Sequence, residues 1–384
     1  MDISVRYRRV GYLSFFFSGI CAISSGIIVS MLQERYGFSF SLTGSLLTAM
    51  SIGNMAAAFL SGILPRFIGV KNTVLILCFG YFLGYMLTAF VGLPWLLLLA
   101  FIMVGLAKGC ALNNSTVLVA KYSENKTRNL QIMHSFYATG ALLCPVIIFA
   151  MAKGGGSFPM IGIALCGLIM WGIFATGALP KKEIKGAEKT SQESRSFMRS
   201  VDFWLLTALI FCQNAAETSV SGWLVTYYRE QQILSGTLSG YTMSIMWGAT
   251  LIARLLIAFV LPIKNKFRAL FLMGLACTAL YAVMIPISSP LPASMMLFAF
   301  AFSMAGVNPM STAGVGEAIS QESMGVMLPI GAIGAIVMPL IIGLAADKFG
   351  LQTGMMLNLV PCAGIAVLSF ILWNRNTKKH SKTV

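Results

Sequence analysis

The sequence predicts an all-α membrane protein with 12 transmembrane helices in two pseudo-symmetric six-helix bundles. The first observation behind this prediction is composition. Of the 384 residues, 57% are hydrophobic and only 10% are charged, whereas soluble domains contain about 25% charged residues. The second observation is a series of apolar runs of about 20 residues, the length at which a helix crosses a bilayer. The third is a repeat that relates the two halves of the chain.

The expected helices follow one another with short breaks that are rich in Gly and Pro, residues that favour turns. The expected spans are 10–32, 42–64, 72–91, 94–120, 131–152, 157–179, 203–228, 240–262, 268–287, 292–317, 325–346 and 352–373. The first run is longer than the apolar core of a signal peptide, which has about 7–15 residues. We therefore expect it to stay in the protein as the first helix.

A polar segment rich in Lys, Glu and Ser lies near the middle of the chain and separates the first six spans from the last six. We expect an N-terminal six-helix bundle in 1–180 and a cytoplasmic linker in 181–202. The remaining residues, 203–384, are expected to form a C-terminal six-helix bundle with a short basic tail.

Lys and Arg residues gather in alternate connections. With the N-terminus inside, 21 of the 27 Lys and Arg residues fall on the inner side and four on the outer side. Because cytoplasmic loops carry such an excess, we expect a multi-pass protein of the bacterial inner membrane with both termini cytoplasmic. The net charge of +15 then reflects topology and not nucleic-acid binding. The basic tail "RNTKKHSK" is expected to face anionic lipid head groups.

The two halves of the chain share polar and turn-forming residues at a nearly constant offset. "SGIIVSMLQE" (25–34) aligns with "SGWLVTYYRE" (221–230) at an offset of 196, and "GALLCP" (140–145) with "GAIVMP" (334–339) at 194. Asn113 aligns with Asn308 at 195. General hydrophobicity does not produce coincident Gly, Pro, Glu and Asn. Two parallel six-helix halves are typical of the major facilitator transporters.

Several motifs carry a resemblance to the major facilitator superfamily over the whole chain. "GLAADKFG" (343–350) resembles the G-x-x-x-D-[RK]-x-G loop signature of that superfamily, and "GILPRFIGVK" (62–71) resembles a degraded copy with Arg66 in place of the acid. "NLQIMHSFYATGALLCP" and "AAETSVSGWLVTYY" are most similar to the fucose–galactose–glucose:proton symporter family. That resemblance implies proton-coupled sugar uptake. The carboxylates that its sugar permeases carry in helices 1 and 4 are absent here.

Glu217 lies near the middle of the expected span 203–228, where an ionisable residue costs at least about 2.5–3.5 kcal/mol. With Gln213, Asn214, Ser221 and Tyr228 it falls within an arc of about 100° on one helix face. Lipid cannot satisfy such a polar stripe. We predict that Gln213, Asn214 and Glu217 bind substrate and that Glu217 also exchanges the coupling proton. The alternative is a structural hydrogen bond to a neighbouring helix.

Lys108 is the second ionisable residue at mid-depth, in the expected span 94–120. A buried lysine needs a counter-ion. Lys108 is expected to pair with Glu217 across the cavity or to bind an anionic group of the substrate. Asn113 lies about 140° from it around the helix, so the two need not face the same cavity. Asn113, Asn308 and Trp247 are also assigned to substrate binding, with packing or a membrane-interface position as the alternative.

Three further charged residues are assigned to gating. Arg254 and Glu317 lie towards the cytoplasmic ends of their expected helices and are predicted to form an inner-gate charge network. Asp347 is the acid of the signature loop and is assigned to gating for that reason. Such charges are expected to bias one conformational state over another.

No catalytic constellation is recognisable. The sequence has no Gly-rich phosphate loop and no metal-ligand cluster, and its 8 Cys are scattered singly, so we expect neither an enzyme nor a cofactor or metal. The prediction is a monomeric secondary transporter that moves a small hydrophilic solute with protons and by alternating access. The resemblance implies that this solute is a sugar. The alternatives are a proton-antiport exporter of drugs or metabolites and a sensor or scaffold that moves no solute.

Overall fold

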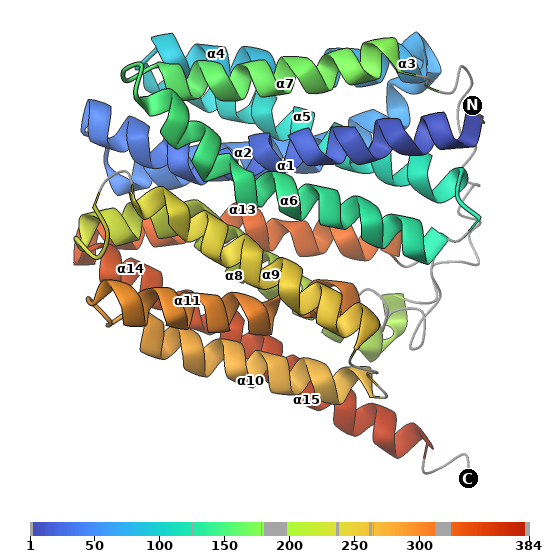
Figure 1. Ribbon diagram of the computed structural model, residues 1–384. Helices are drawn as coiled ribbons and strands as arrows, with labels where there is room; N and C mark the ends of the chain where they lie inside the picture. Colours follow the sequence, from blue (N-terminus) through green and yellow to red (C-terminus); the bar gives the residue numbers. More distant parts are fainter. Residues whose placement is uncertain are drawn as a thin grey trace.

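The computed structural model describes residues 3–124, 126–177, 198–235, 238–260, 265–311 and 324–380, together with 179 and 263. The helices of the first half run alongside one another in the upper part of Figure 1. They are α1 (Ile3–Tyr36), α2 (Phe40–Ile63), α3 (Pro65–Cys78), α4 (Gly80–Phe90), α5 (Pro94–Lys121), α6 (Lys126–Ala152) and α7 (Phe158–Thr176).

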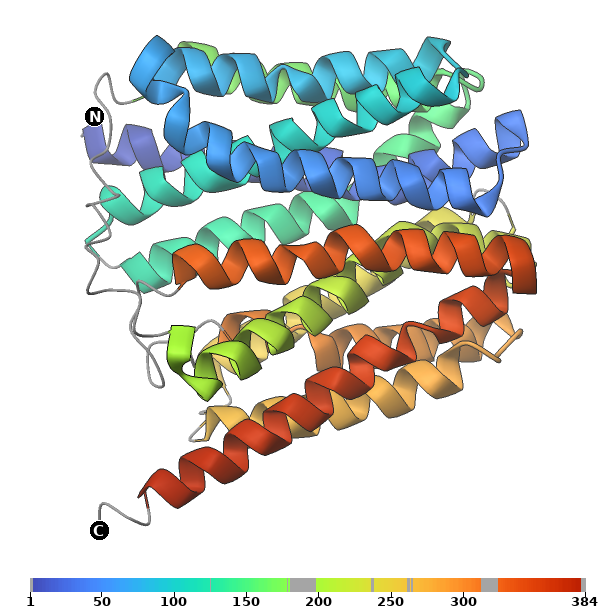
Figure 2. The ribbon, with the colours of Figure 1, turned by 180° about the vertical axis from the view of Figure 1, so that it is seen from behind.

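The helices of the second half lie below them in the same view. They are α8 (Val201–Glu230), the short 3-10 helix η2 (Leu238–Tyr241), α9 (Thr242–Phe259), α10 (Lys266–Met284), α11 (Pro290–Met304), α13 (Met324–Phe349), α14 (Leu351–Met356) and α15 (Leu359–His380). Seen from the front and from behind, α13 runs along the border between the two groups (Figures 1 and 2). It packs against α2 on one side and α8 on the other.

The length and hydropathy of the helices support the predicted fold class. Within the described residues, 11 helices are long and apolar enough to cross a membrane. The helix missing from that set is α8, which crosses the bundle beside the others (Figures 1 and 2). Its polar residues lower its hydropathy although its length is 30 residues. The all-α membrane architecture is confirmed, and α8 stands out as the helix whose composition is least suited to lipid.

Most expected spans match helices of the structure, but three of them are not single helices. The helix α11 in the expected run 292–317 ends at Met304, and the expected run 352–373 is divided into α14 and α15. The expected run 72–91 is divided into α3 and α4 by a break at Phe79, and α3 begins earlier, at Pro65. A Pro at the first turn suits a helix start because its missing N–H has no intrahelical partner there. The expected linker 181–202 lies mostly outside the described residues, so the predicted domain boundaries stay a prediction.

The repeated "GALLCP" and "GAIVMP" motifs have the same packing role in each half. A Cβ atom on Gly140 would lie 2.0 Å from the carbonyl oxygen of Phe16, where α6 crosses α1. A Cβ atom on Gly334 would lie 2.2 Å from the carbonyl oxygen of Phe211, where α13 crosses α8. Small residues let membrane helices approach this closely. The repeat in the sequence is therefore a repeated helix crossing.

Candidate functional site

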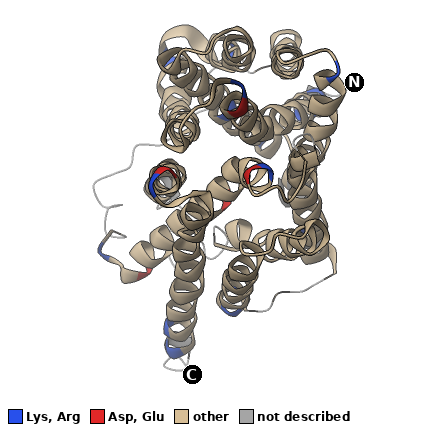
Figure 3. Ribbon diagram, turned by 90° about the vertical axis from the view of Figure 1, so that its left-hand side faces the viewer, with Lys and Arg blue, Asp and Glu red and all other residues tan. Residues whose placement is uncertain are grey.

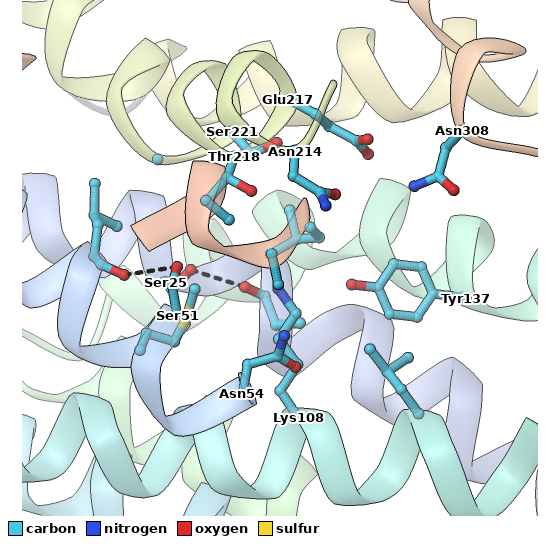
Figure 4. Close-up of a pocket in the computed structure, with 18 of the residues that line it drawn as sticks. Ser25, Ser51, Asn54, Lys108, Tyr137, Asn214, Glu217, Thr218, Ser221 and Asn308 are labelled. Atoms are coloured by element: carbon cyan, nitrogen blue, oxygen red, sulfur yellow. Dashed lines mark hydrogen bonds between the residues drawn. The ribbon is translucent and has the colours of Figure 1, made fainter. Parts of the chain in front are cut away.

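A cavity of about 380 Å³ lies between the two halves of the molecule (Figure 4). It falls within the range of about 300–1,000 Å³ that is usual for small-ligand sites. The first half contributes α1, α2, α5 and α6, and the second contributes α8, α9, α13 and the segment around residue 308. The polar lining residues are Ser25, Ser51, Asn54, Lys108, His134, Tyr137, Asn214, Glu217, Thr218, Ser221, Trp247, Arg254 and Asn308.

The polar stripe of α8 faces this cavity. Asn214, Glu217, Thr218 and Ser221 recur at helical spacing, and all four line the cavity (Figure 4). Gln213 is not among the lining residues. Its Nε2 instead donates a hydrogen bond of 2.6 Å to Oε2 of Glu217. The structure therefore places Gln213 as a support that orients the carboxylate, and leaves the carboxylate itself accessible from the cavity.

Lys108 reaches the cavity from the opposite side, from the middle of α5 (Figure 4). Leu112, one turn later, also lines the cavity, while Asn113 is exposed and is not a lining residue. Lys108 and Asn113 therefore do not face the same cavity, as their separation of about 140° around the helix predicts. Among the described residues, no ion pair or hydrogen bond joins Lys108 to Glu217, which acts on it only through the electric field across the cavity.

Two aromatic side chains from different halves form one wall of the cavity. The ring of Tyr137 on α6 meets the ring of Trp247 on α9 edge to face, with centroids 5.5 Å apart. The Tyr137 hydroxyl points into the cavity (Figure 4). The Trp247 indole N–H is buried and has no acceptor among the described residues. Buried indole donors usually have a partner, so this N–H is an exception among the described residues.

Arg254 lies at the cavity and not only at a gate. It lines the cavity together with Glu217, and both residues also line a smaller adjoining pocket. Its Nε donates a long hydrogen bond of 3.4 Å to the carbonyl oxygen of Ala305. Glu317, its expected partner in an inner gate, lies outside the described residues. The structure therefore adds a cation to the predicted substrate site.

Several lining residues were not predicted from the sequence. Asn54 stands alone in an apolar stretch of α2, and that isolation was a usable signal. Tyr137 and Ser51 carry no such signal, since Tyr and Ser are common in helix packing. His134 also lines the cavity and packs edge-on against Phe15 with ring centroids 5.5 Å apart.

At the end of the molecule opposite both termini, the two halves are joined by polar contacts (Figure 1). We call it the contact end; Figure 3 looks onto it and shows acidic and basic segments side by side. Arg229 at the end of α8 donates through Nη1 to the carbonyl oxygen of Ser30 at 2.6 Å and to Oε2 of Glu34 at 2.8 Å, both on α1.

Asp347 makes the second contact of the contact end, between α13 and α2. Its carboxylate accepts hydrogen bonds from the backbone N–H groups of Phe40 at 2.7 Å and Ser41 at 2.8 Å, and from the Ser41 hydroxyl. These are the first N–H groups of α2, which lack intrahelical partners, and a negative charge is favoured at a helix N-terminus. The acid of the "GLAADKFG" loop thus caps a helix of the other half.

Comparison with known proteins agrees with this architecture. Over 307 residues the chain is 20% identical to the TsgA homolog of Yersinia pestis (strain Pestoides F), covering 78% of this chain and 76% of that protein. It is 29% identical to a gallate transporter of Pseudomonas putida over 147 residues, which are 38% of this chain and only 30% of that protein.

Solved structures share the fold at low sequence identity. The nucleoside transporter NupG matches with a TM-score of 0.76 at 12% identity, covering 97% of this chain and 99% of NupG. The E. coli fucose:proton symporter FucP matches with a TM-score of 0.64 at 14% identity, covering 96% and 99%. The model of the Major Facilitator Superfamily matches residues 11–330. With the fold, the repeat and the central cavity, this match establishes that the chain belongs to the Major Facilitator Superfamily, a family of transporters.

Proposed function

We propose that the protein carries a small polar solute through the central cavity together with protons, and that Glu217 is the group that takes up and releases the proton. One observation carries this proposal. Glu217 is the sole carboxylate among the lining residues that the structure describes, and it lies midway along α8 where the two halves meet. A mid-membrane carboxylate that faces a cavity is suited to reversible protonation.

The composition of the cavity favours a hydrophilic solute over the alternative, an exporter of apolar drugs. Of its 23 described lining residues, 13 carry a polar or charged group, and they come from both halves. An apolar drug would leave these groups without hydrogen-bond partners, which is costly. The similar proteins point the same way, since their names refer to a nucleoside, fucose and gallate, which are small hydroxylated molecules.

We also propose that Arg229 and Asp347 hold the two halves together at the contact end and so keep the cavity shut on that side. With both termini in the cytoplasm of a bacterial inner membrane, the contact end faces outwards. Loss of these contacts would then accompany opening to the outside, as in rocking of one bundle against the other. The functional unit in this proposal is one chain in the lipid bilayer.

Accumulation in proteoliposomes tests the coupling role of Glu217. Purified protein is reconstituted with fucose, gallate or a nucleoside outside, and uptake is followed with and without an inward proton gradient. We expect the gradient to drive accumulation in wild type. We expect Glu217→Gln, which stays neutral, to lose that accumulation while it still exchanges internal for external solute. Accumulation by Glu217→Gln at the wild-type level would contradict the proposal.

A further inference from the structure

The charges around the cavity do not balance. Lys108 on α5 and Arg254 on α9 are the cations, and Glu217 on α8 is the carboxylate. The other titratable lining groups are His134 and Tyr137, both on α6. The described lining residues of α1, α2 and α13 carry no titratable group. The described lining residues of the cavity therefore include two cationic side chains and one anionic side chain, and the two halves contribute charges of opposite sign at α5 and α8.

Among the described residues, neither cation is paired with a carboxylate. Lys108 has no hydrogen bond or ion pair there. The hydrogen bond of Arg254 within that part of the chain is a long one to a neutral carbonyl group, and its guanidinium stays protonated in proteins. The available carboxylate, that of Glu217, is hydrogen-bonded by the amide of Gln213 and by neither cation. Because unpaired cations at membrane depth are costly, they mark a site for an anion.

We propose that the solute is a small organic anion: a single-ring acid whose carboxylate binds Lys108 in the positive field shared with Arg254. This proposal rests on the proposed transport function and names its substrate class. The edge-to-face pair Tyr137 and Trp247 offers a surface for the ring, and the Tyr137 hydroxyl, which points into the cavity (Figure 4), offers a hydrogen bond to a ring hydroxyl. A single ring with one carboxylate suits a cavity of about 380 Å³.

The same arrangement links the anion to the proton. While Glu217 is ionised, its charge opposes the two cations and repels an incoming carboxylate. When Glu217 takes up a proton, the positive field of Lys108 and Arg254 is no longer opposed. Anion and proton then bind cooperatively, and by linkage each raises the affinity of the site for the other. A proton on His134 would act in the same direction.

Calorimetric titration of the full chain in detergent tests the proposal with acids and their neutral partners. The pairs are 4-hydroxybenzoate with 4-hydroxybenzamide and glucuronate with glucose, so each pair differs mainly in charge. We expect at least one acid to bind at least about tenfold more tightly than its neutral partner. Lys108→Gln should remove that difference, and Lys108→Arg, which keeps the charge, should retain most of it. A melting curve for each variant separates loss of binding from loss of folding.

The charge of Glu217 sharpens the same test. Glu217→Gln, which carries no negative charge, should bind the acid more tightly than wild type does at the same pH. The inference is overturned if no acid binds better than its neutral partner, or if folded Lys108→Gln keeps the preference. If wild type accumulates a neutral solute, Glu217→Gln does not, and no acid binds preferentially, then the proposed function stands and this inference fails. If acids bind through Lys108 but accumulation is independent of Glu217, the inference stands and proton coupling fails.

Discussion

The first helices of the two halves, α1 and α8, share the repeated residues but differ in the ionisable group that only α8 presents to the cavity. At the offset of 196, Ser25 corresponds to Ser221, and both line the cavity. At the same offset Cys21 corresponds to Glu217. Cys21 is fully buried and its thiol donates to the carbonyl oxygen of Ile163 at 3.7 Å. Glu217 faces the cavity. The repeat thus determines where the helices lie, and single departures from it determine what the cavity binds.

The two halves also fill the space around these positions differently. In the first half two tyrosines of α4 occupy it: the Tyr81 and Ser18 hydroxyls are hydrogen-bonded at 3.1 Å, and Tyr85 donates to the carbonyl oxygen of Cys21 at 2.5 Å. These contacts bury the face of α1 that carries Ser18 and Cys21 against α4. In the second half, Asn214 and Glu217 remain open to the cavity. At this level α1 is therefore packed against its own half, and of the two first helices it is α8 that presents an ionisable side chain to the cavity.

Exchanging the two unlike residues is the strongest test of this difference. In Cys21→Glu the new carboxylate would be buried without a partner, which costs about 3–5 kcal/mol or more, so we expect a large loss of folded protein. Glu217→Cys removes a charge from a polar cavity and should melt close to wild type. Size-exclusion profiles and melting curves in detergent measure both. Equal stability of the two variants would break the comparison.

Because the helix crossings at Gly140 and Gly334 are repeated, we expect equal losses of stability when either glycine is replaced. Gly140→Ala and Gly334→Ala each place a Cβ atom against a backbone carbonyl, at 2.0 and 2.2 Å before any shift. Such overpacking costs about 1–3 kcal/mol. Gly172→Ala is the control, because nothing lies within 4 Å of a Cβ atom there. We expect similar losses of melting temperature for the first two variants and none for the third. A loss in one half alone would mean that the repeat does not extend to this crossing.

The contact end gives the smallest expected effect on stability and a distinct effect on conformation. Asp347→Asn weakens the cap on α2, and because the site is exposed, the loss of stability should be below about 1 kcal/mol. The population of states should still shift towards separation of α2 from α13. Spin-label distances between those two helix ends, in a cysteine-free background, measure the shift. Lys348→Gln is the neighbouring control, and the same shift in both variants would contradict the assigned role of Asp347.

The fold was largely predictable because hydropathy and turn residues are local features of the sequence, and the repeat is found by aligning its two halves. The break at Phe79 was not, since apolar residues continue on both sides of it. In the site, Glu217 and Lys108 could be predicted because a charge in an apolar run is conspicuous. The supporting position of Gln213 and the cavity position of Arg254 depend on which neighbours the helices meet. Asp347 bonds a backbone 307 residues away, a contact that no local pattern contains.

Proton movement driven by solute is the most direct measurement of the central claim, that the unshared Glu217 couples transport. Proteoliposomes containing a trapped pH indicator are given a transported solute without any imposed gradient. We predict that entry of the solute carries protons inwards and acidifies the interior in wild type and in Cys21→Ser, the matched change on α1. In Glu217→Gln, solute exchange should continue with no change of internal pH. Acidification by Glu217→Gln equal to that of wild type would contradict the account.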